Sequence, residues 1–161
     1  MRPTEELRYL LLAVQREGNR MLAEALRPLD LTPSQAEVLR VLQERQPLSL
    51  VALGDLLVCE HGSPSRLVNG LVEAGLIERT PSTTNGRMVT LVLTTEGEQR
   101  AELVKGVEEM MYQLIDKILP DVSIPDLNAL LWRFVEGRTA GNALARRTDR
   151  SRPEPDNVKN H

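Results

Sequence analysis

Hydrophobic side chains recur at helical spacing in two long stretches of the chain, one on each side of a central segment with shorter elements. In residues 5–26 the apolar positions fall on one stripe of a helix, and in residues 98–118 a second stripe continues for about twenty residues. Pro28 ends the first stretch and Pro120 ends the second. The pattern therefore predicts two long amphipathic helices that flank the centre of the chain.

The central segment begins with two shorter predicted helices. Thr32 and Gln35 have the spacing of a capping box, and the helix that they start is expected over residues 33–44. Ser49 is a candidate N-cap for a second helix over residues 50–57, which a tight non-helical stretch follows. We therefore expect the chain to turn directly after this second helix.

A third helix begins after that turn. Ser63 followed by Pro64 is typical of an N-cap with a proline in the first helical turn, and apolar residues then share one face. Gly75 supplies the left-handed residue that often follows the end of a helix. The order helix, turn, helix over residues 50–75 predicts a helix-turn-helix.

Beyond this helix the apolar period changes to that of a β-strand. Two short apolar runs flank a segment rich in turn-forming residues, which is centred on Asn85 and Gly86, and this predicts a β-hairpin with a protruding loop. Thr95 and Glu98 have capping-box spacing at the start of the second long helix, and a final helix is expected over residues 123–135. The fold class is therefore mainly α, a winged helix with six helices and a two- to three-stranded β wing.

Residues 138–161 differ in composition from the single domain predicted over residues 1–137. They contain few apolar side chains and carry six lysines or arginines against three acids, which predicts a flexible basic tail. The tail either attracts phosphate nonspecifically or is simply solvated. Its candidate residues are Arg146, Arg147, Arg150 and Arg152.

Composition excludes several classes of site. The single cysteine rules out an intrachain disulfide and a multi-cysteine zinc site, and with two histidines no metal-ligand spacing is present. We find no nucleophile with a base, no carboxylate pair and no phosphate loop, so we expect no enzyme activity and no cofactor. The lone cysteine suits a reducing compartment and no apolar run approaches about 18 residues, so we expect a cytoplasmic protein without a membrane span.

The formal net charge of −3 hides an uneven distribution of charge. Residues 94–137 carry nine acids and four bases, whereas residues 62–93 carry three arginines and two acids. A protein that reads specific DNA sites needs only a locally basic surface. The acids therefore lie largely outside the predicted helix-turn-helix and hairpin.

These elements resemble those of the multiple antibiotic resistance regulator (MarR) family of bacterial transcription factors. The resemblance rests on three segments within residues 31–97, LTPSQAEVLRVL, LGDLLVCEHGSPSRLVNGLVEAGLIER and NGRMVTLVLTTEG. It implies that residues 31–97 are a winged helix-turn-helix that binds double-stranded DNA, and that residues 5–30 and 98–137 form a homodimer. It also implies that the helix over residues 63–73 reads the major groove while a wing arginine enters the minor groove.

Five residues at the start of this helix are candidate DNA contacts. The hydroxyls of Ser63 and Ser65 suit phosphate or base edges, and Pro64 lies in the same first turn. Arg66 suits guanine or phosphate, and Asn69 has the two-atom geometry that adenine requires. The alternative is that Ser63 only caps the helix and that the other side chains are only solvated.

In the wing, Arg87 matches the family's minor-groove arginine, and its alternative role is a salt bridge across the hairpin. Asn85 stands where the family usually has an aspartate that holds this arginine. Gly70 replaces a residue that is often basic, which implies modest DNA affinity. His61 is interpreted as a phosphate or solvent contact, and Arg79 as a partner of Glu78, a contact to the DNA backbone or a solvated residue.

Two further features leave alternatives open. Cys59 precedes the reading helix, whose N-terminus could lower the thiol pKa and create a redox switch, although a free cysteine is more often a buried small apolar residue. The family also often binds small aromatic acids between its dimerisation and reading regions. This implies a small-molecule effector to which Tyr112 and Trp132 could contribute, whereas core packing explains the same apolar positions.

The leading hypothesis is a sequence-specific transcription regulator, expected to be a repressor. It would bind a pseudo-palindromic operator as a homodimer and be released by an effector. The alternative is a winged-helix module that has lost specific DNA binding and contacts a protein partner instead. Gly70, Asn85 and the net negative charge favour this alternative.

Overall fold

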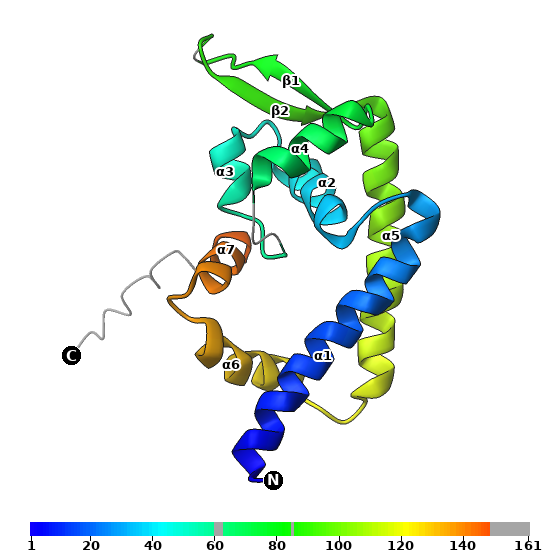
Figure 1. The fold of residues 1–161 in the computed structure, drawn as a ribbon, viewed down its shortest axis with the longest axis vertical. Coiled ribbons are helices and arrows are strands. Elements are labelled where there is room, and N and C mark those ends of the chain that lie inside the picture. The colour runs from blue at the N-terminus through cyan, green and yellow to red at the C-terminus, as the bar shows by residue number, and fades with distance from the viewer. Residues whose placement is uncertain (60–62, 85, 149–161) are drawn as a thin grey trace, which may run out of the picture.

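The structure is a computed structural model that describes residues 1–59, 63–84 and 86–148 of the 161. In these ranges seven α-helices, one short 3-10 helix and one β-hairpin follow each other along the chain (Figure 1). Their order is α1 (Pro3–Leu26), η1 (Arg27–Leu29), α2 (Pro33–Arg45), α3 (Leu50–Gly54), α4 (Pro64–Glu73), β1 (Ile77–Pro81), β2 (Val89–Leu93), α5 (Thr95–Ile118), α6 (Ile124–Val135) and α7 (Thr139–Arg147).

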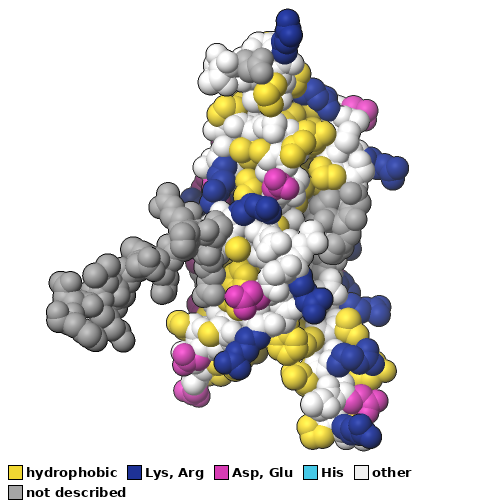
Figure 2. All heavy atoms as spheres, turned by 90° about the vertical axis from the view of Figure 1, so that its left-hand side faces the viewer, with side chains coloured by type: hydrophobic (Ala, Val, Ile, Leu, Met, Phe, Trp, Pro, Cys, Tyr) yellow, Lys and Arg dark blue, Asp and Glu magenta, His cyan; other side chains and the backbone are white. Residues whose placement is uncertain are grey.

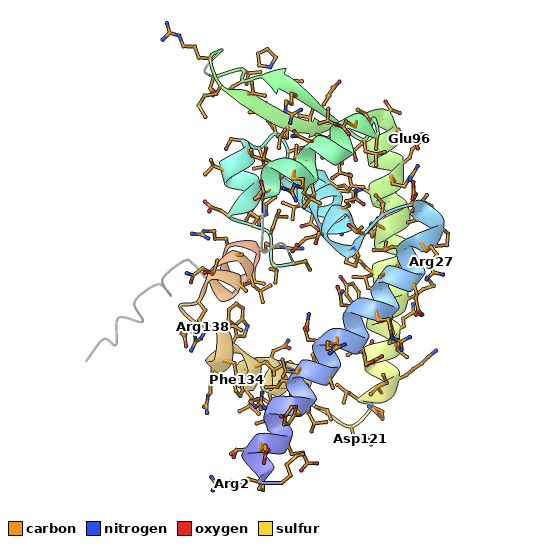
Figure 3. The ribbon with its side chains drawn as sticks, viewed as in Figure 1. Arg2, Arg27, Glu96, Asp121, Phe134 and Arg138 are labelled. Atoms are coloured by element: carbon orange, nitrogen blue, oxygen red, sulfur yellow. The ribbon has the colours of Figure 1, made fainter. Side chains whose placement is uncertain are left out.

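The two long helices α1 and α5 contact each other and connect the two ends of the molecule (Figure 1). Helix α5 runs from the Glu96 end, beside the hairpin, to the Asp121 end, near α6 (Figure 3). The helix-turn-helix and the hairpin occupy one end, and α6 occupies the other. The mainly α winged-helix fold predicted from the sequence is confirmed.

The hydrophobic core lies where α2, α3, α4 and the hairpin meet the first half of α5. Its fully buried large side chains come from these elements and from the end of α1, and they are Leu26, Val38, Leu39, Val41, Leu42, Leu53, Val68, Leu71, Ile77 and Val104. Aliphatic side chains supply this core, as expected for a chain with 2% aromatic residues. The core thus fixes α4 and the hairpin to one support.

The predicted cap of α2 is confirmed, and the predicted cap of α5 needs correction. The Gln35 amide donates to Thr32 Oγ1 at 3.3 Å while Gln35 Oε1 accepts from the Thr32 amide at 2.9 Å, so the capping box is confirmed. The prediction that Thr95 caps α5 is wrong, because Thr94 Oγ1 accepts from the Gly97 amide at 3.0 Å. Thr94 has the extended backbone that an N-cap needs, whereas Thr95 already lies in the helix.

The hairpin pairs β1 and β2 antiparallel, with Ile77 opposite Leu93 and Pro81 opposite Val89. A single bridge joins Leu48 to Leu91 on the outer side of β2, with the Leu91 amide donating to the Leu48 carbonyl at 2.7 Å. The sheet therefore has two strands plus one bridging residue, within the two to three strands predicted.

Two predictions about helix number and extent need correction. Residues 139–147, assigned to a tail in the sequence analysis, form α7 instead, so the described residues contain seven α-helices rather than six. The buried residues Gly141 and Ala143 lie in α7, and this packing explains helix formation in a segment with few apolar side chains. Helix α3 ends at Gly54 rather than at residue 57.

No helix in the described part of the chain combines the length and the apolar content needed to cross a membrane.

Candidate nucleic-acid interface

Helix α4 has one buried face and one exposed face. Val68 and Leu71 are completely buried against the core, and Leu67 and Val72 pack beside them. The opposite face and the first turn expose polar side chains, and these are Ser63, Ser65, Arg66 and Asn69. Because the apolar face fixes the helix to α2 and α3, the polar face is presented to the solvent in one orientation.

The first turn of α4 is arranged for contacts outside the helix. Ser63 occupies the N-cap position, where its carbonyl accepts from the Arg66 amide at 3.1 Å. Its hydroxyl makes no capping hydrogen bond, so the prediction that this side chain caps the helix is wrong, although its position is right. Pro64 is half-buried at the first helical position. The Ser63 hydroxyl is therefore not used to cap the helix, and it lies at the helix N-terminus, where a phosphate is favoured.

Asn69 and Arg79 form a polar pair between α4 and β1. An Arg79 guanidinium nitrogen donates to Asn69 Oδ1, and both side chains are exposed. None of the roles considered for Arg79 in the sequence analysis included this pairing. Because adenine needs both the oxygen and the nitrogen of an asparagine amide, Arg79 competes with a base for Asn69. The pair therefore connects the reading helix to the wing.

The wing extends beyond the core. Its loop is closed by a hydrogen bond from the Ser82 amide to the Met88 carbonyl at 2.7 Å, and Thr80 and Thr90 join their hydroxyls across the strands at 3.2 Å. Arg87 lies in this loop and is exposed. Asn85, predicted to support Arg87, lies outside the described residues, as does His61. The structure therefore brings Arg87 to the tip of the wing, on the same hairpin as Arg79.

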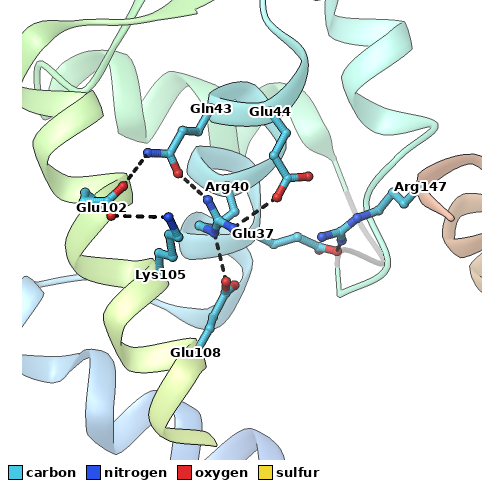
Figure 4. Close-up of polar contacts among 8 residues, drawn as sticks. All are labelled: Glu37, Arg40, Gln43, Glu44, Glu102, Lys105, Glu108 and Arg147. Atoms are coloured by element: carbon cyan, nitrogen blue, oxygen red, sulfur yellow. Dashed lines mark hydrogen bonds and ion pairs between the residues drawn. The ribbon is translucent and has the colours of Figure 1, made fainter. Parts of the chain in front are cut away.

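A polar network fixes α2 to α5 behind the interface (Figure 4). Arg40 Nε donates to Glu108 Oε2 at 2.9 Å, and Gln43 Nε2 donates to Glu102 Oε2 at 3.2 Å. The exposed fraction of the Arg40 side chain is 14%, so this ion pair is better shielded from water than an ordinary surface pair. Helix α2, on which α4 packs, is thereby attached to the long helix.

Cys59 does not behave as either interpretation of the sequence expected. It is exposed, so it is not a buried apolar residue. Partial desolvation of the thiol, together with the nearby Glu37 carboxylate, raises the pKa of Cys59 from its ordinary 9.0 to about 11. The predicted lowering of the thiol pKa by the helix N-terminus is therefore wrong, and a reactive thiolate at neutral pH is not supported.

A hollow of about 380 Å³ lies where α3 meets the first turn of α4. Its lining is Leu50, Val51, Gly54, Asp55, Ser63, Pro64 and Ser65. This hollow is separate from the apolar stripes of the long helices, where the sequence analysis places an effector. No group of three or more potential metal ligands occurs among residues 1–59, 63–84 and 86–148.

Comparisons with known proteins agree with this geometry. Residues 31–97 match the winged helix DNA-binding domain family. The multiple antibiotic resistance protein MarR of Escherichia coli (strain K12) is 32% identical over 119 residues, which cover 73% of this chain and 83% of that protein. The chain belongs to the MarR family. The HTH-type transcriptional repressor IacR of Pseudomonas putida is 24% identical over 123 residues, covering 76% of this chain and 74% of IacR.

Solved structures of the MarR family have the same fold. A mutant E. coli MarR complexed with operator DNA has a TM-score of 0.65 and 26% sequence identity, covering 80% of this chain and 91% of that chain. The MepR–DNA complex of S. aureus has a TM-score of 0.66 at 21% identity, covering 80% of this chain and 93% of that chain. The resemblance to the MarR family predicted from the sequence is thus confirmed.

Two contacts near the interface were missed by the sequence analysis. Glu37 is almost fully buried in α2 and accepts hydrogen bonds from the Val58 and Cys59 amides, in the turn before α4. Arg147 of α7 forms an ion pair with the same carboxylate. An acid directly between the apolar residues Ala36 and Val38 was the available signal, because a buried carboxylate needs nearby donors.

Proposed function

We propose that this member of the MarR family is a cytoplasmic transcription regulator that binds a pseudo-palindromic operator as a homodimer and represses transcription. The observation that carries the proposal is α4, whose buried side fixes it to the core while Ser65, Arg66 and Asn69 remain exposed next to the wing. In this proposal α4 enters the major groove, and repression results from blocking polymerase.

Each exposed side chain has a specific role in this proposal. Arg66 contacts guanine or a phosphate, and Asn69 contacts adenine after Arg79 has released its oxygen. Ser63 and Ser65 bind phosphates at the helix start, and Pro64 sets the helix there. Arg87 enters the minor groove, whose negative potential favours a cation. His61 and Asn85 remain additional candidate contacts in the turn and wing.

A homodimer is supported by apolar surface on the terminal helices. Figure 2 shows hydrophobic side chains exposed at the lower end of the molecule, where α1 and α6 lie. Leu10, Leu130 and Phe134 each keep more than half of their surface exposed in the single chain. Contiguous apolar surface of this kind marks a protein interface, and a two-fold dimer would place two α4 helices about 34 Å apart.

The relatives support DNA binding and repression. The structures of E. coli MarR and S. aureus MepR named above are complexes with DNA, and IacR is named a transcriptional repressor. Relatives of this kind also favour a regulator over an enzyme. Release from DNA by a small-molecule effector belongs to the same proposal, with Tyr112 on α5 and Trp132 on α6 as candidate contacts.

The experiment is a gel-shift titration with DNA from the promoter region next to the gene, compared with a scrambled duplex of equal length. We expect the wild type to bind one site in the promoter DNA far more tightly than the scrambled duplex. Arg66→Ala and Arg87→Ala should each weaken that binding about tenfold or more, since a good base or groove contact contributes about 1–3 kcal/mol.

Two results would contradict the proposal. Equal weak affinity of the wild type for both duplexes would exclude specific reading. Unchanged DNA binding by both variants, together with loss of a specific protein partner in a pull-down, would favour the alternative role as a protein-interaction module. The acidic net charge of −3 is the observation that favours this second function.

A further inference from the structure

The end of helix α7 contacts the winged-helix region at three points, two of them in α2 and one directly after α3. Arg147 Nη1 donates to Glu37 Oε1 at 2.8 Å, which joins α7 to α2 (Figure 4). Arg146 Nη1 donates to the Asp55 carbonyl at 3.2 Å, and Arg45 Nη2 donates to the Arg147 carbonyl at 3.0 Å. Helix α7 therefore contacts α2 at Glu37 and Arg45, and it contacts the chain directly after α3 at Asp55.

Glu37 connects these contacts to the reading helix. Its two carboxylate oxygens accept from consecutive backbone amides, Val58 to Oε1 and Cys59 to Oε2, each at 2.8 Å. Val58 and Cys59 lie in the turn between α3 and α4. Two successive amides that donate to one carboxylate must both point towards it, so the backbone between them has a fixed direction. Both hydrogen bonds are charge-assisted and therefore stronger than neutral ones.

Arg147 completes the set of partners of this carboxylate. The exposed fraction of the Glu37 side chain is 8%, so water has little access to it, and Glu37 Oε1 is shared by the Val58 amide and Arg147. A buried carboxylate that loses its cation keeps a desolvated charge with only amide donors. Removal of Arg147 therefore acts on the hydrogen bonds between Glu37 and the turn.

The start of α7 is placed by a close approach to α6. A Cβ added at Gly141 would lie 1.9 Å from the Val135 carbonyl oxygen, so only glycine fits at this crossing. Gly137, between the two helices, has a φ of +71°. Ala143 is buried in the same helix. The packing of α7 against the end of α6 thus helps to determine where Arg147 lies.

We propose that Arg147 is a positioning residue for DNA reading: by pairing with Glu37 it holds the turn at Val58 and Cys59, and this turn sets where the first residues of α4 lie. The inference rests on the proposed function, because it assumes that α4 reads DNA. Helix α7 itself does not contact the duplex in this account. Helix α7 therefore affects operator affinity indirectly, through Glu37 and the turn before α4.

The test compares Arg147→Ala, Arg147→Lys, Glu37→Gln and the double variant with the wild type by fluorescence anisotropy, on operator and scrambled duplexes at several salt concentrations. Lys105→Ala is the matched control, because it also removes one cation but only breaks an exposed pair with Glu102. Circular dichroism confirms that each variant is folded at the assay temperature. Sedimentation velocity shows whether each remains in the wild-type oligomeric state.

We expect Arg147→Ala to weaken operator binding about tenfold, the usual size of a lost charge-assisted hydrogen bond, and Arg147→Lys to weaken it less. Affinity for scrambled DNA and the salt slope should stay at wild-type values, as for Lys105→Ala. In the Glu37→Gln background, Arg147→Ala should have little further effect, because Arg147 acts through Glu37.

Two outcomes would overturn the inference. Wild-type operator affinity in folded Arg147→Ala would show that the pair of Arg147 and Glu37 does not affect DNA reading. An equal loss on both duplexes, with the salt slope reduced by about one, would show that Arg147 contacts a phosphate directly. Failure of the proposed function looks different, since the wild type itself would then not prefer the operator.

A measurement without DNA keeps the inference testable in either case. Amide hydrogen exchange at Val58 and Cys59 should become faster in Arg147→Ala and remain unchanged in Lys105→Ala. Gly141→Ala, which displaces the start of α7 without altering any charge, should speed the same two amides. Unchanged exchange in both Arg147→Ala and Gly141→Ala would contradict the proposal that α7 holds this turn through Glu37.

Discussion

The winged-helix region and the terminal helices differ in how far their apolar side chains are buried. Between Leu31 and Leu93, Leu39, Leu42, Leu53 and Leu71 of α2, α3 and α4 are buried in one core, and Leu50 and Leu67 pack against it. In α1, all of which is described, Leu26 is the only buried residue, and α6 has no buried residue although most of its sequence is apolar. One region therefore completes its core within the chain, whereas the other leaves an apolar surface open.

This difference indicates a division of roles. A region with a closed core can hold α4 and the wing in one orientation without help from another molecule. Helices with an open apolar surface need a partner to bury it, and a second copy of the chain offers the same surface in a two-fold arrangement. In the proposed function, the first region reads DNA and the second forms the dimer.

The largest expected effect comes from a charge placed on the open surface. Leu130→Asp should convert the proposed dimer into monomers and weaken operator binding more than about 100-fold, because a carboxylate buried between subunits would lose its hydration. Sedimentation velocity and gel-shift titration measure the two effects. Asn128→Asp, an exposed change on the same helix, is the control and should change neither. A dimer of Leu130→Asp with full affinity would show that α6 is not in the interface.

A second prediction compares two glycines of α5, one in the core and one outside it. A Cβ at Gly97 would lie 2.0 Å from the Leu76 carbonyl oxygen, whereas a Cβ at Gly106 meets nothing within 4 Å. Gly97→Ala should lower the free energy of unfolding by about 3 kcal/mol, since the backbone must move, as in other overpacked cores. Gly106→Ala should raise it by up to about 1 kcal/mol through helix propensity. Urea unfolding measures both changes in the free energy of unfolding. Equal changes would contradict the difference in packing between the core end of α5 at Gly97 and the open part at Gly106.

A third prediction separates base reading from charge at the Asn69–Arg79 pair. Asn69→Ala should lower operator affinity about tenfold while leaving the affinity for scrambled DNA unchanged, because only a base contact is lost. Arg79, once released from Asn69, is proposed to contact a phosphate, so Arg79→Ala should weaken binding to both duplexes and reduce the salt slope by about one. Titration by fluorescence anisotropy at four salt concentrations distinguishes the two patterns. Identical patterns for both variants would exclude a base-reading role for Asn69.

The smallest expected effect concerns Cys59, in the turn of the winged-helix region. Because its folded pKa, about 11, lies above its ordinary value of 9.0, the folded state binds the thiol proton more tightly. The stabilisation from this shift is present below pH 9 and is lost as the pH rises towards 11. Alkylation by iodoacetamide should therefore be slow at pH 7 and still increase above pH 9. A rate that levels off near pH 9 would contradict the raised pKa.

The sequence predicted the fold better than it predicted the contacts around the site. The period of the apolar residues and the caps at Thr32 and Ser49 located the main helices, because these signals are local. The pairs Asn69–Arg79 and Glu37–Arg147 join residues that only the tertiary fold brings together, so spacing along the chain could not reveal them.

Helix α7 illustrates a second reason for such failures. Its nine residues are too few for a helix that is stable alone, and its composition is that of a solvated segment. Burial of Ala143 and the contacts of Arg146 and Arg147 with Asp55 and Glu37 stabilise it in the fold. Composition was therefore a poor guide where a few tertiary contacts decide the conformation.

The most direct test of the account is sedimentation equilibrium of the free protein and of its complex with the operator duplex. The account predicts a free species of about twice the chain mass of 18.0 kDa and a complex that holds two chains per duplex. A free monomer of 18.0 kDa that still binds the operator, as one chain per duplex, would contradict it.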